Sequence, residues 1–469
     1  MWTDFLILMK QEMAVIAMIF ILLFMKLGRD RSNESFMNTM NVLLLLNLIL
    51  GFVFNHEGIL FNEMFRTSRL IAFEKNILNL AMLIISLQSY SWLKTNKHVP
   101  EFYILMLSSL LGMFFMISSG NLLMFYLGLE MSTIPLAAAA NFDLTKRRSS
   151  EGAMKLIFSS AFSSACLLFG ISMLYGTTGT LVFSELPHLI NNNPLQLFAF
   201  ILIIAGFAFK ISVVPFHLWT ADVYEGAPVA VTSFLSVVSK GAVLFAFVSV
   251  LYTVFSPLAK VWYNMLFILS LLTIITGNLF AIRQENFKRF LAFSSIAQVG
   301  FILVGISRSS DISTTSVIYF VLIYVFSNLA AFGVVSLVTA VTGKENISDY
   351  KGFYKTNPGL SWVLTIALFS LAGVPPTAGF FGKFFLLIAG AGKGNYVLIS
   401  IAAVNIVISL YYYLRVVKAI FMDANPTPLP SIRTPLMPKL AFIVCVAGAV
   451  TIGVVSPVYD YIYSLIVLR

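Results

Sequence analysis

Two lysines lie within otherwise apolar sequence in AGFAFKISVVPFHLWTADVYEGAPVAVTSFLSVVSKGA, residues 205–242. Lys210 is followed five residues later by Pro215, and Lys240 comes after a link, residues 222–228, that contains acidic residues, glycine and proline. A charged side chain near the centre of a membrane helix costs about 2.5–3.5 kcal/mol on insertion scales, so it is kept mainly where it faces other helices or water. The stretch therefore predicts a membrane protein with a polar interior.

Pro215 predicts an interrupted helix. It has no N–H to donate to the carbonyl of Ile211, the residue next to Lys210. A helix broken beside an ionisable group exposes oriented backbone dipoles and admits water, as at the ion sites of transporters. The alternative is a proline kink whose lysine extends to the headgroups. We expect a span at 195–220, which puts Lys210 near its middle and favours the first interpretation.

The composition excludes a soluble domain. Of 469 residues, 59% are hydrophobic and 11% are charged. The net charge of +10 arises from basic residues in short loops, so it is a topology signal and does not indicate nucleic-acid binding. Cys166 and Cys445 stand alone in separate apolar spans, which predicts no disulfide framework, metal site or redox centre.

The apolar runs predict fourteen helices, if about 20 residues are taken as one span. Their ranges are 5–26, 38–56, 70–93, 101–119, 121–141, 151–175, 195–220, 227–255, 261–282, 290–307, 312–342, 359–391, 396–422 and 440–466.

Basic residues are concentrated in alternate connections, as the positive-inside rule requires. One set contains Lys26, Arg29, Arg31, Lys94, Lys97, Lys146, Arg147, Arg148, Arg283, Lys288, Arg289, Lys344, Lys351, Lys355, Lys418, Arg433 and Lys439. The other set contains Arg66, Arg69, Lys260, Arg308, Lys393 and Arg469, and it rises only to eight when Lys10 and Lys75, each just inside an outer helix end, are added. This asymmetry places both termini on the outer side.

A second interrupted helix is predicted in LAGVPPTAGFFGKFF, residues 371–385, where Pro375 precedes Lys383. The helices that contain Pro215 and Pro375 are five apart in the count, and an odd offset inverts topology. Helices 4–8 and 9–13 therefore form a predicted inverted five-helix repeat, with two unrelated broken helices as the alternative. The predicted units are an N-terminal segment (1–100), two repeats (101–255 and 256–422) and a C-terminal helix (423–469).

Further polar residues lie within the predicted spans. Glu130 is near the middle of the fifth helix, and Ser236 lies one turn before Lys240 on one face of the eighth. Gln298 lies in the tenth helix. Lys155, near the inner boundary, forms an i, i+4 pair with an acid in the sixth helix, and we weigh structural pairing and a functional role equally for it.

The acidic link between the seventh and eighth helices breaks the positive-inside pattern. Asp222 and Glu225 are candidates for an inner-face proton funnel, with capping of the loop as the equal alternative. His217 is interpreted as a hydrogen-bonding group at a helix end in preference to a relay. Burial disfavours a charged lysine and a nearby carboxylate favours it, so a chain of buried lysines beside an acid predicts proton handling.

Four motifs resemble one family closely. LGLEMSTIPL (127–136), GFAFKISVVPFHLWTADVYEGAP (206–228), SVVSK (236–240) and LAGVPPTAGFFGKF (371–384) are similar to the antiporter-like subunit N of respiratory complex I, the proton-pumping NADH:quinone oxidoreductase. The resemblance implies discontinuous helices at Pro215 and Pro375. It also implies a central proton-transfer axis at the four matching positions, Glu130, Lys210, Lys240 and Lys383.

The resemblance has one departure that affects the relay. Several relatives have histidine where this chain has Gln298, and a glutamine organises water without titrating.

The resemblance implies a subunit that moves protons in a bacterial inner membrane, packed against sister antiporter-like subunits. It implies no cofactor in this chain, and FMN, iron–sulfur clusters and quinone in partner subunits. One alternative is a subunit of a multisubunit sodium/proton antiporter, which shares the motifs of helices 5 and 7. Another is a scaffold whose lysines only form charged pairs.

Overall fold

The computed structural model describes residues 2–28, 31–53, 56–392, 396–455 and 457–467. Apart from one short hairpin, its regular structure is helical, so the predicted all-α membrane fold is confirmed. Arg29, Lys393 and Arg469, which entered the charge comparison, and residues 54–55 of the second predicted span lie outside the described residues.

Ten helices in the described part of the chain are long and apolar enough to cross a membrane. Three shorter apolar helices are α10 (Pro194–Lys210), α18 (Pro358–Ala372) and α19 (Ala378–Ala391). Each predicted span overlaps one helix or a run of consecutive helices. The total of fourteen spans and the inverted repeat remain predictions.

The N-terminal segment has two short elements among its long helices. It contains α1 (Trp2–Leu8), α2 (Lys10–Leu27), α3 (Asn33–Leu50), β1 (Gly58–Leu60), β2 (Phe65–Thr67), α4 (Arg69–Gln88) and α5 (Tyr90–Leu93). The strands form an antiparallel hairpin. Ser32 and Ser68 fix the starts of α3 and α4 because their side chains accept a hydrogen bond from the first helical turn.

The middle of the chain contains the first interrupted helix. Its elements are α6 (Val99–Ile117), α7 (Leu122–Ala140), α8 (Arg147–Thr178), α9 (Leu186–Leu189), α10, α11 (Leu218–Gly226), α12 (Val229–Phe234), the π-helix η1 (Leu235–Ser239) and α13 (Lys240–Thr253).

The last part of the chain contains the second interrupted helix. Its elements are η2 (Ser256–Leu258), α14 (Ala259–Arg283), α15 (Phe287–Ile306), α16 (Asp311–Thr342), η3 (Ile347–Tyr350), α17 (Phe353–Thr356), α18, α19, α20 (Tyr396–Phe421), α21 (Leu436–Val454) and α22 (Pro457–Val467).

Several predicted boundaries are wrong. The span predicted at 440–466 is two helices, α21 and α22, the one at 5–26 is divided between α1 and α2, and the one at 70–93 is divided between α4 and α5. The link at 222–228 was expected to be a turn, but α11 continues through it to Gly226. Its acids have basic partners on neighbouring helices, which helps to stabilise a helix where glycine and proline suggested a loop.

Glycines allow two helix pairs to approach closely. A Cβ on Gly112 of α6 would lie 2.4 Å from the backbone nitrogen of Ser132 on α7. A Cβ on Gly277 of α14 would lie 2.6 Å from the backbone nitrogen of Ala297 on α15. Small residues at helix contacts are how membrane helices bring their backbones together. The two pairs correspond to helices 4–5 and 9–10, the equivalent positions of the predicted repeats.

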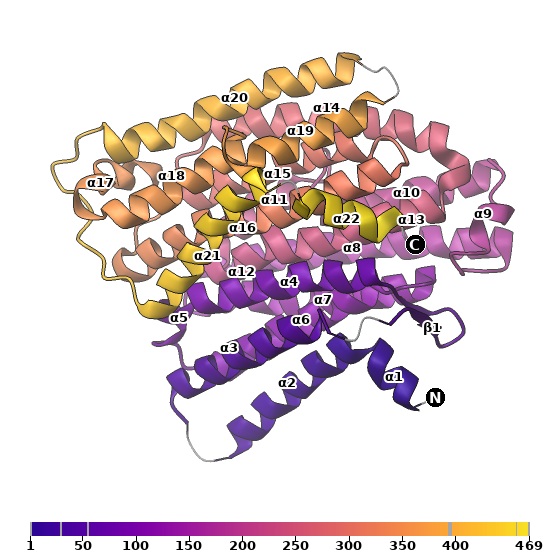
Figure 1. Ribbon diagram of the computed structural model, residues 1–469, viewed down its shortest axis with the longest axis horizontal. Coiled ribbons are helices and arrows are strands. Elements are labelled where there is room, and N and C mark those ends of the chain that lie inside the picture. Colours follow the sequence, from indigo (N-terminus) through magenta and orange to yellow (C-terminus); the bar gives the residue numbers. More distant parts are fainter. Residues whose placement is uncertain (1, 29–30, 54–55, 393–395, 456, 468–469) are drawn as a thin grey trace.

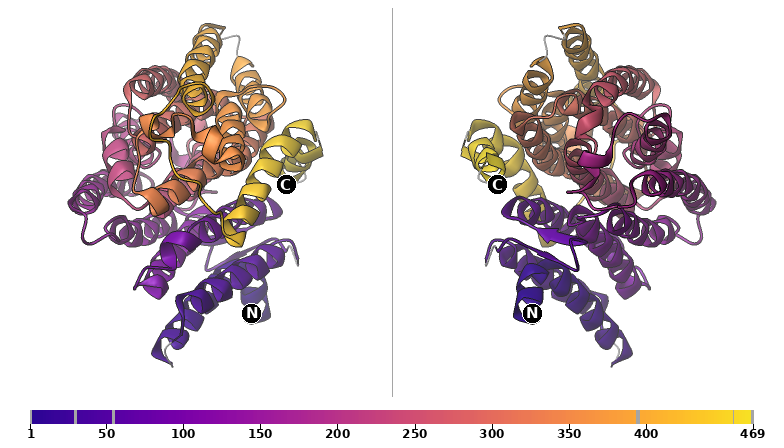
Figure 2. Two further views of the ribbon diagram at one scale, coloured as in Figure 1. Left: turned by 90° about the vertical axis from the view of Figure 1, so that its left-hand side faces the viewer. Right: turned by 90° about the vertical axis from the view of Figure 1, so that its right-hand side faces the viewer.

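α16 lies at the centre of the bundle, and its most apolar stretch is entirely buried (Figure 1). α2 and α3 form a layer at one edge, and α20 lies at the opposite edge (Figure 2). The hairpin and α9 lie toward one end of the helices, while α5 and α17 lie toward the other. Connections predicted on the same side of the membrane thus lie at the same end.

Candidate functional site

Lys210 is the last residue of α10 and is held by hydroxyl groups. Its Nζ donates to Thr133 Oγ1 of α7 at 2.9 Å and to Ser160 Oγ of α8 at 2.5 Å. Glu130 lies one turn before Thr133 and interacts electrostatically with Lys210. Its Oε1 is buried without a hydrogen-bond partner among the described residues. The structure therefore brings acid and lysine together without a direct ion pair of 4 Å or less.

The predicted break after Lys210 is present. α10 ends at Lys210 and α11 begins at Leu218, with Pro215 between them. The indole Nε1 of Trp219 donates to the carbonyl of Phe209 at 3.1 Å. Side chains of the second half-helix thus bond to the end of the first, which holds the lysine in a fixed place.

Lys240 is buried where η1 meets α13. Its Nζ donates to Ser295 Oγ of α15 at 2.8 Å and lies 5.5 Å from the ring centre of Tyr224. Ser236, predicted on the same face, contacts a different neighbour, because its Oγ accepts from Asn328 Nδ2 of α16 at 2.7 Å.

Lys383 is buried beside the second break. α18 ends at Ala372 and is capped by Gly373, whose φ of +85° favours glycine, and Pro375 lies in the connection to α19. The Nζ of Lys383 donates to the carbonyl of Leu371 at 2.8 Å and to that of Ala372 at 3.1 Å. An ammonium group thereby satisfies two carbonyls at a helix end that the break leaves free.

Polar groups lie between Lys240 and Lys383 in two hydrogen-bonded sets, which meet at adjacent residues of α15. Ser295, the partner of Lys240, is next to Ser294, whose hydroxyl is hydrogen-bonded to Tyr413 OH of α20. Gln298 Nε2 lies 3.3 Å from Tyr413 OH and donates to the Leu371 carbonyl at 2.9 Å. That same carbonyl accepts from Lys383. The predicted water-organising role for Gln298 thus acquires two defined protein partners.

Sequence reasoning missed Thr133, Ser160, Ser295 and Tyr413. Thr133 stands within the glutamate motif, and Ser295 adjoins Ser294, which lies one turn before Gln298 on the tenth helix. Tyr413 has no comparable signal. In the thirteenth helix, Tyr411 lies four residues before Arg415, but it is 62% exposed, whereas Tyr413 is fully buried.

The acidic residues of α11 form an ion-pair cluster at the predicted inner end. Asp222 contacts Lys155 Nζ and Arg289 Nη1, each at 2.7 Å, and Lys155 also contacts its predicted partner Glu151 at 2.8 Å. Burial opposes ionisation of Asp222, but the two cations outweigh it and hold the pKa of this carboxyl below its usual value. Lys155 is thus structurally paired, and its functional role stays open.

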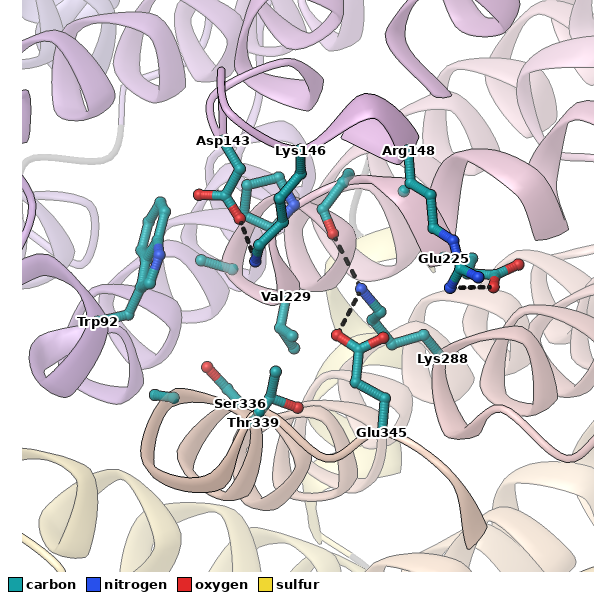
Figure 3. Close-up of a pocket in the computed structure, with 16 residues that line it drawn as sticks. Trp92, Asp143, Lys146, Arg148, Glu225, Val229, Lys288, Ser336, Thr339 and Glu345 are labelled. Carbon is teal, nitrogen blue, oxygen red and sulfur yellow. Dashed lines mark hydrogen bonds and ion pairs between the residues drawn. The ribbon is translucent and has the colours of Figure 1, made fainter. Parts of the chain in front are cut away.

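A cavity of about 420 Å³ opens beside this cluster (Figure 3). Lys288, almost wholly buried, contacts Glu345 at 3.0 Å and donates to the carbonyl of Ala227 at 3.4 Å. Arg148 and Glu225 form a further pair at 3.2 Å. The cavity extends from charged groups to the start of α12, the short helix that precedes η1 and Lys240.

His217 lies at the start of α11, as predicted, but its side chain makes no capping hydrogen bond there. The ring is buried, and Nδ1 has no partner in the described part of the chain.

A family model described as NADH:quinone oxidoreductase/Mrp antiporter, transmembrane, matches residues 119–409. The chain is 43% identical to NADH-quinone oxidoreductase subunit N of Phocaeicola vulgatus, over 98% of each chain. It is 47% identical to the subunit of the same name of Azobacteroides pseudotrichonymphae, over 88% of this chain and 87% of that one.

Solved structures share the fold. A chain of respiratory complex I from Thermus thermophilus matches with a TM-score of 0.81 and 26% identity, over 94% of this chain and 96% of that one. A chain of the Mrp complex from Dietzia matches with a TM-score of 0.86 over 99% and 97% of the two chains, but at 17% identity it shows the fold alone. By the near full-length match to subunit N sequences, the chain belongs to the family of NADH-quinone oxidoreductase N subunits, within the transmembrane family shared with Mrp antiporters.

Proposed function

We propose that this chain is a proton-translocating membrane subunit of an NADH-quinone oxidoreductase. Its own residues carry out no redox chemistry. Protons pass along Glu130, Lys210, Lys240 and Lys383, which the sequence motifs single out. Family membership supports the assembly, and the polar line from Lys240 to Lys383 is the observation that carries the mechanism.

Glu130 sets the charge of Lys210 in this mechanism. An ammonium group is favoured by a nearby carboxylate and disfavoured by burial, so a movement of Glu130 shifts the protonation of Lys210. When Lys210 loses its proton, the N–H bond breaks and a water oxygen receives the hydrogen. The hydroxyls of Thr133 and Ser160 keep the nitrogen in place in both states.

The second half of the path is built from groups that exchange donor and acceptor roles. Hydroxyls of Ser295, Ser294 and Tyr413 can each accept and donate. Gln298 orders the hydroxyl of Tyr413 relative to the Leu371 carbonyl. Water completes the proton path where these groups do not bond to each other, as over the interval from Lys210 to Lys240.

Partners supply the chemistry that drives the path. We place FMN, iron–sulfur clusters and quinone in other subunits, with sister antiporter-like subunits beside this chain in a bacterial inner membrane. Both termini lie on the outer side. A pull-down of the intact assembly in mild detergent should therefore recover flavin and iron–sulfur subunits together with this chain.

Substitution of Lys210 tests the mechanism. Lys210→Ala should remove NADH-driven proton transport into vesicles while the complex still assembles and oxidises NADH with an artificial acceptor. Lys260→Ala, which removes an exposed lysine outside the path, is the control and should pump normally. Normal pumping by an assembled Lys210→Ala complex would leave the lysines as structural charges only.

The alternative function is that of a sodium/proton antiporter subunit, because the chain shares its fold with a chain of the Mrp complex. It predicts exchange that depends on sodium and needs no NADH. Proton transport that requires NADH and is unchanged when sodium is replaced by potassium would exclude it.

A further inference from the structure

A buried ion pair lies in the N-terminal helices, outside the proposed path. Lys75 Nζ of α4 lies 2.5 Å from Glu12 Oε1 of α2, and each side chain is 1% exposed. Lys75 also lies over the rings of Phe65 and Phe114, at 5.2 and 6.0 Å from their centres. Removal of two charges from water costs several kcal/mol per ion, so packing alone is a weak reason for such a pair.

Buried polar side chains gather where α2, α3 and α4 meet, a contact called the seam below. Asn76 accepts from Gln11 Nε2 at 2.8 Å, and Asn79 lies one turn after Lys75. On the facing helix α3, Asn47 lies one turn before Gly51. A Cβ on Gly51 would clash with the side chain of Asn76, so α3 and α4 are close together here. Beyond the oxygen that pairs with Lys75, the following buried atoms have no hydrogen-bond partner in the described part of the chain: Glu12 Oε2, both amide atoms of Asn47 and Asn79, and Asn76 Nδ2.

Buried polar groups in proteins are almost always hydrogen-bonded, to protein or to ordered water. Six orphaned atoms at one three-helix contact therefore point to bound water. Asn47 also lines an otherwise apolar groove of about 420 Å³ between α2 and α3, so the site for water is the polar contact itself. The ligand that this chemistry fits is a small cluster of water molecules.

The seam has polar groups beyond the pair. Lys10 and Glu74 adjoin it and have contacts of their own, so two acids and two bases are present. Two turns beyond Asn79 on α4, Ser86 Oγ donates to Asn41 Oδ1 at 2.6 Å and lies 2.8 Å from Tyr103 OH.

Leu78 on α4 faces Gly241, the residue after Lys240. The seam therefore lies beside the central lysine without belonging to its hydrogen-bonded line.

We propose that Glu12 and Lys75, with the amides of Asn47, Asn76 and Asn79, form a second buried proton-exchanging site that binds water. In the exchange, an N–H bond of Lys75 breaks and an O–H bond forms on Glu12, directly or through one water. Both side chains become neutral, and the reverse transfer restores the pair. The site communicates with the region of Lys240 through α4.

The double variant Glu12→Gln with Lys75→Met tests this site. It removes both charges together, so no unpaired ion is left to prevent folding. We expect an assembled complex that oxidises NADH but loses most of its proton transport. The matched control is Lys26→Met with Glu101→Gln, which removes the exposed pair of 2.7 Å between α2 and α6. Wild-type pumping by the double variant would overturn the proposal.

Asn79→Leu keeps the ion pair and removes only the amide, so it decides the matter if the double variant does not assemble. We expect weaker proton transport in this variant as well, and unchanged transport would count against the site.

Two direct measurements distinguish a proton-exchanging site from a purely structural ion pair. NADH-induced infrared difference spectra should contain a protonated-carboxyl band that disappears in Glu12→Gln. A high-resolution structure of the complex should show water within hydrogen-bond distance of Asn47 and Asn79. A dry seam or an unchanged band would each refute the proposal, whatever the result for Lys210→Ala.

Discussion

At the scale of single residues, the main feature is that Lys210 is bound by hydroxyls. A direct bond to Glu130 would make one residue control both the position and the charge of the lysine. Thr133 and Ser160 instead fix the position of the nitrogen and serve both the ammonium and the amine. Position and charge are therefore controlled by different residues.

The double variant Thr133→Val with Ser160→Ala should impair positioning without removing the lysine. Hydrogen bonds to charged groups contribute about 1.5–3 kcal/mol each, so the loss of both should slow proton transport by roughly tenfold or more. Initial rates of NADH-driven proton uptake measure it. Ser159→Ala is the control, because Ser159 is hydrogen-bonded to backbone carbonyls of its own helix. An equal loss in the control would remove the assigned role.

Sequence indicated the charged residues of the site but not their neutral partners. A lysine or glutamate in an apolar run is conspicuous because burial is costly, whereas serine and tyrosine occur throughout membrane helices. Tyr413 lies on α20, more than a hundred residues from Gln298, and only tertiary packing brings the two together. Spacing along one helix cannot show such a contact.

At the scale of elements, the two breaks expose helix ends that side chains then satisfy. Trp219 bonds to the end of α10, and Lys383 bonds to the end of α18. In the second case the group that satisfies the carbonyls is itself a proposed proton carrier. Backbone geometry and the location of that charge are thus linked.

Gly373→Ala tests this link. The residue has φ +85°, where a Cβ costs about 1–2 kcal/mol, and the added Cβ would lie 3.1 Å from Lys383 Cδ. We expect lower thermal stability together with slower proton transport. Gly359→Ala, on the same helix with open space around it, should be neutral or stabilising. Equal melting temperatures for both variants would contradict the strain.

Prolines revealed both breaks in advance because proline removes a helix hydrogen bond. The division of the last span into α21 and α22 was not foreseen, since hydropathy alone does not resolve a bend within an apolar run. The helical state of Asp222 and Glu225 was also missed. It is supported by Lys155 and Arg289, which are distant in sequence.

At the scale of the whole molecule, charged groups gather at one end of the helices. The basic connections and the acidic cluster of α11 lie toward the end marked by α5 and α17, away from the hairpin. Cations at this end pair with the few acids present, as Arg148 does with Glu225. The positive-inside rule then predicts that this end faces the cytoplasm.

Labelling of single cysteines tests this orientation. In a Cys166→Ala background, a cysteine placed at the exposed Asn191 should react with a membrane-impermeant maleimide in intact spheroplasts. A cysteine at the exposed Lys344 should react only after permeabilisation. The buried Cys445 should stay silent in both. The reverse pattern would invert the topology.

The π-helix η1 constrains how this chain can change in length. A π-turn behaves as one surplus residue within an α-helix. Deletion of Val237 or Val238 would remove that surplus, so ordinary α winding would return and the helix on either side would keep its orientation. Lys240 would still face Ser295, and Ser236 would keep its neighbours on α16. A one-codon loss within the π-turn should therefore be tolerated better than the same loss within α13, where it would rotate every later residue of the helix by about 100°.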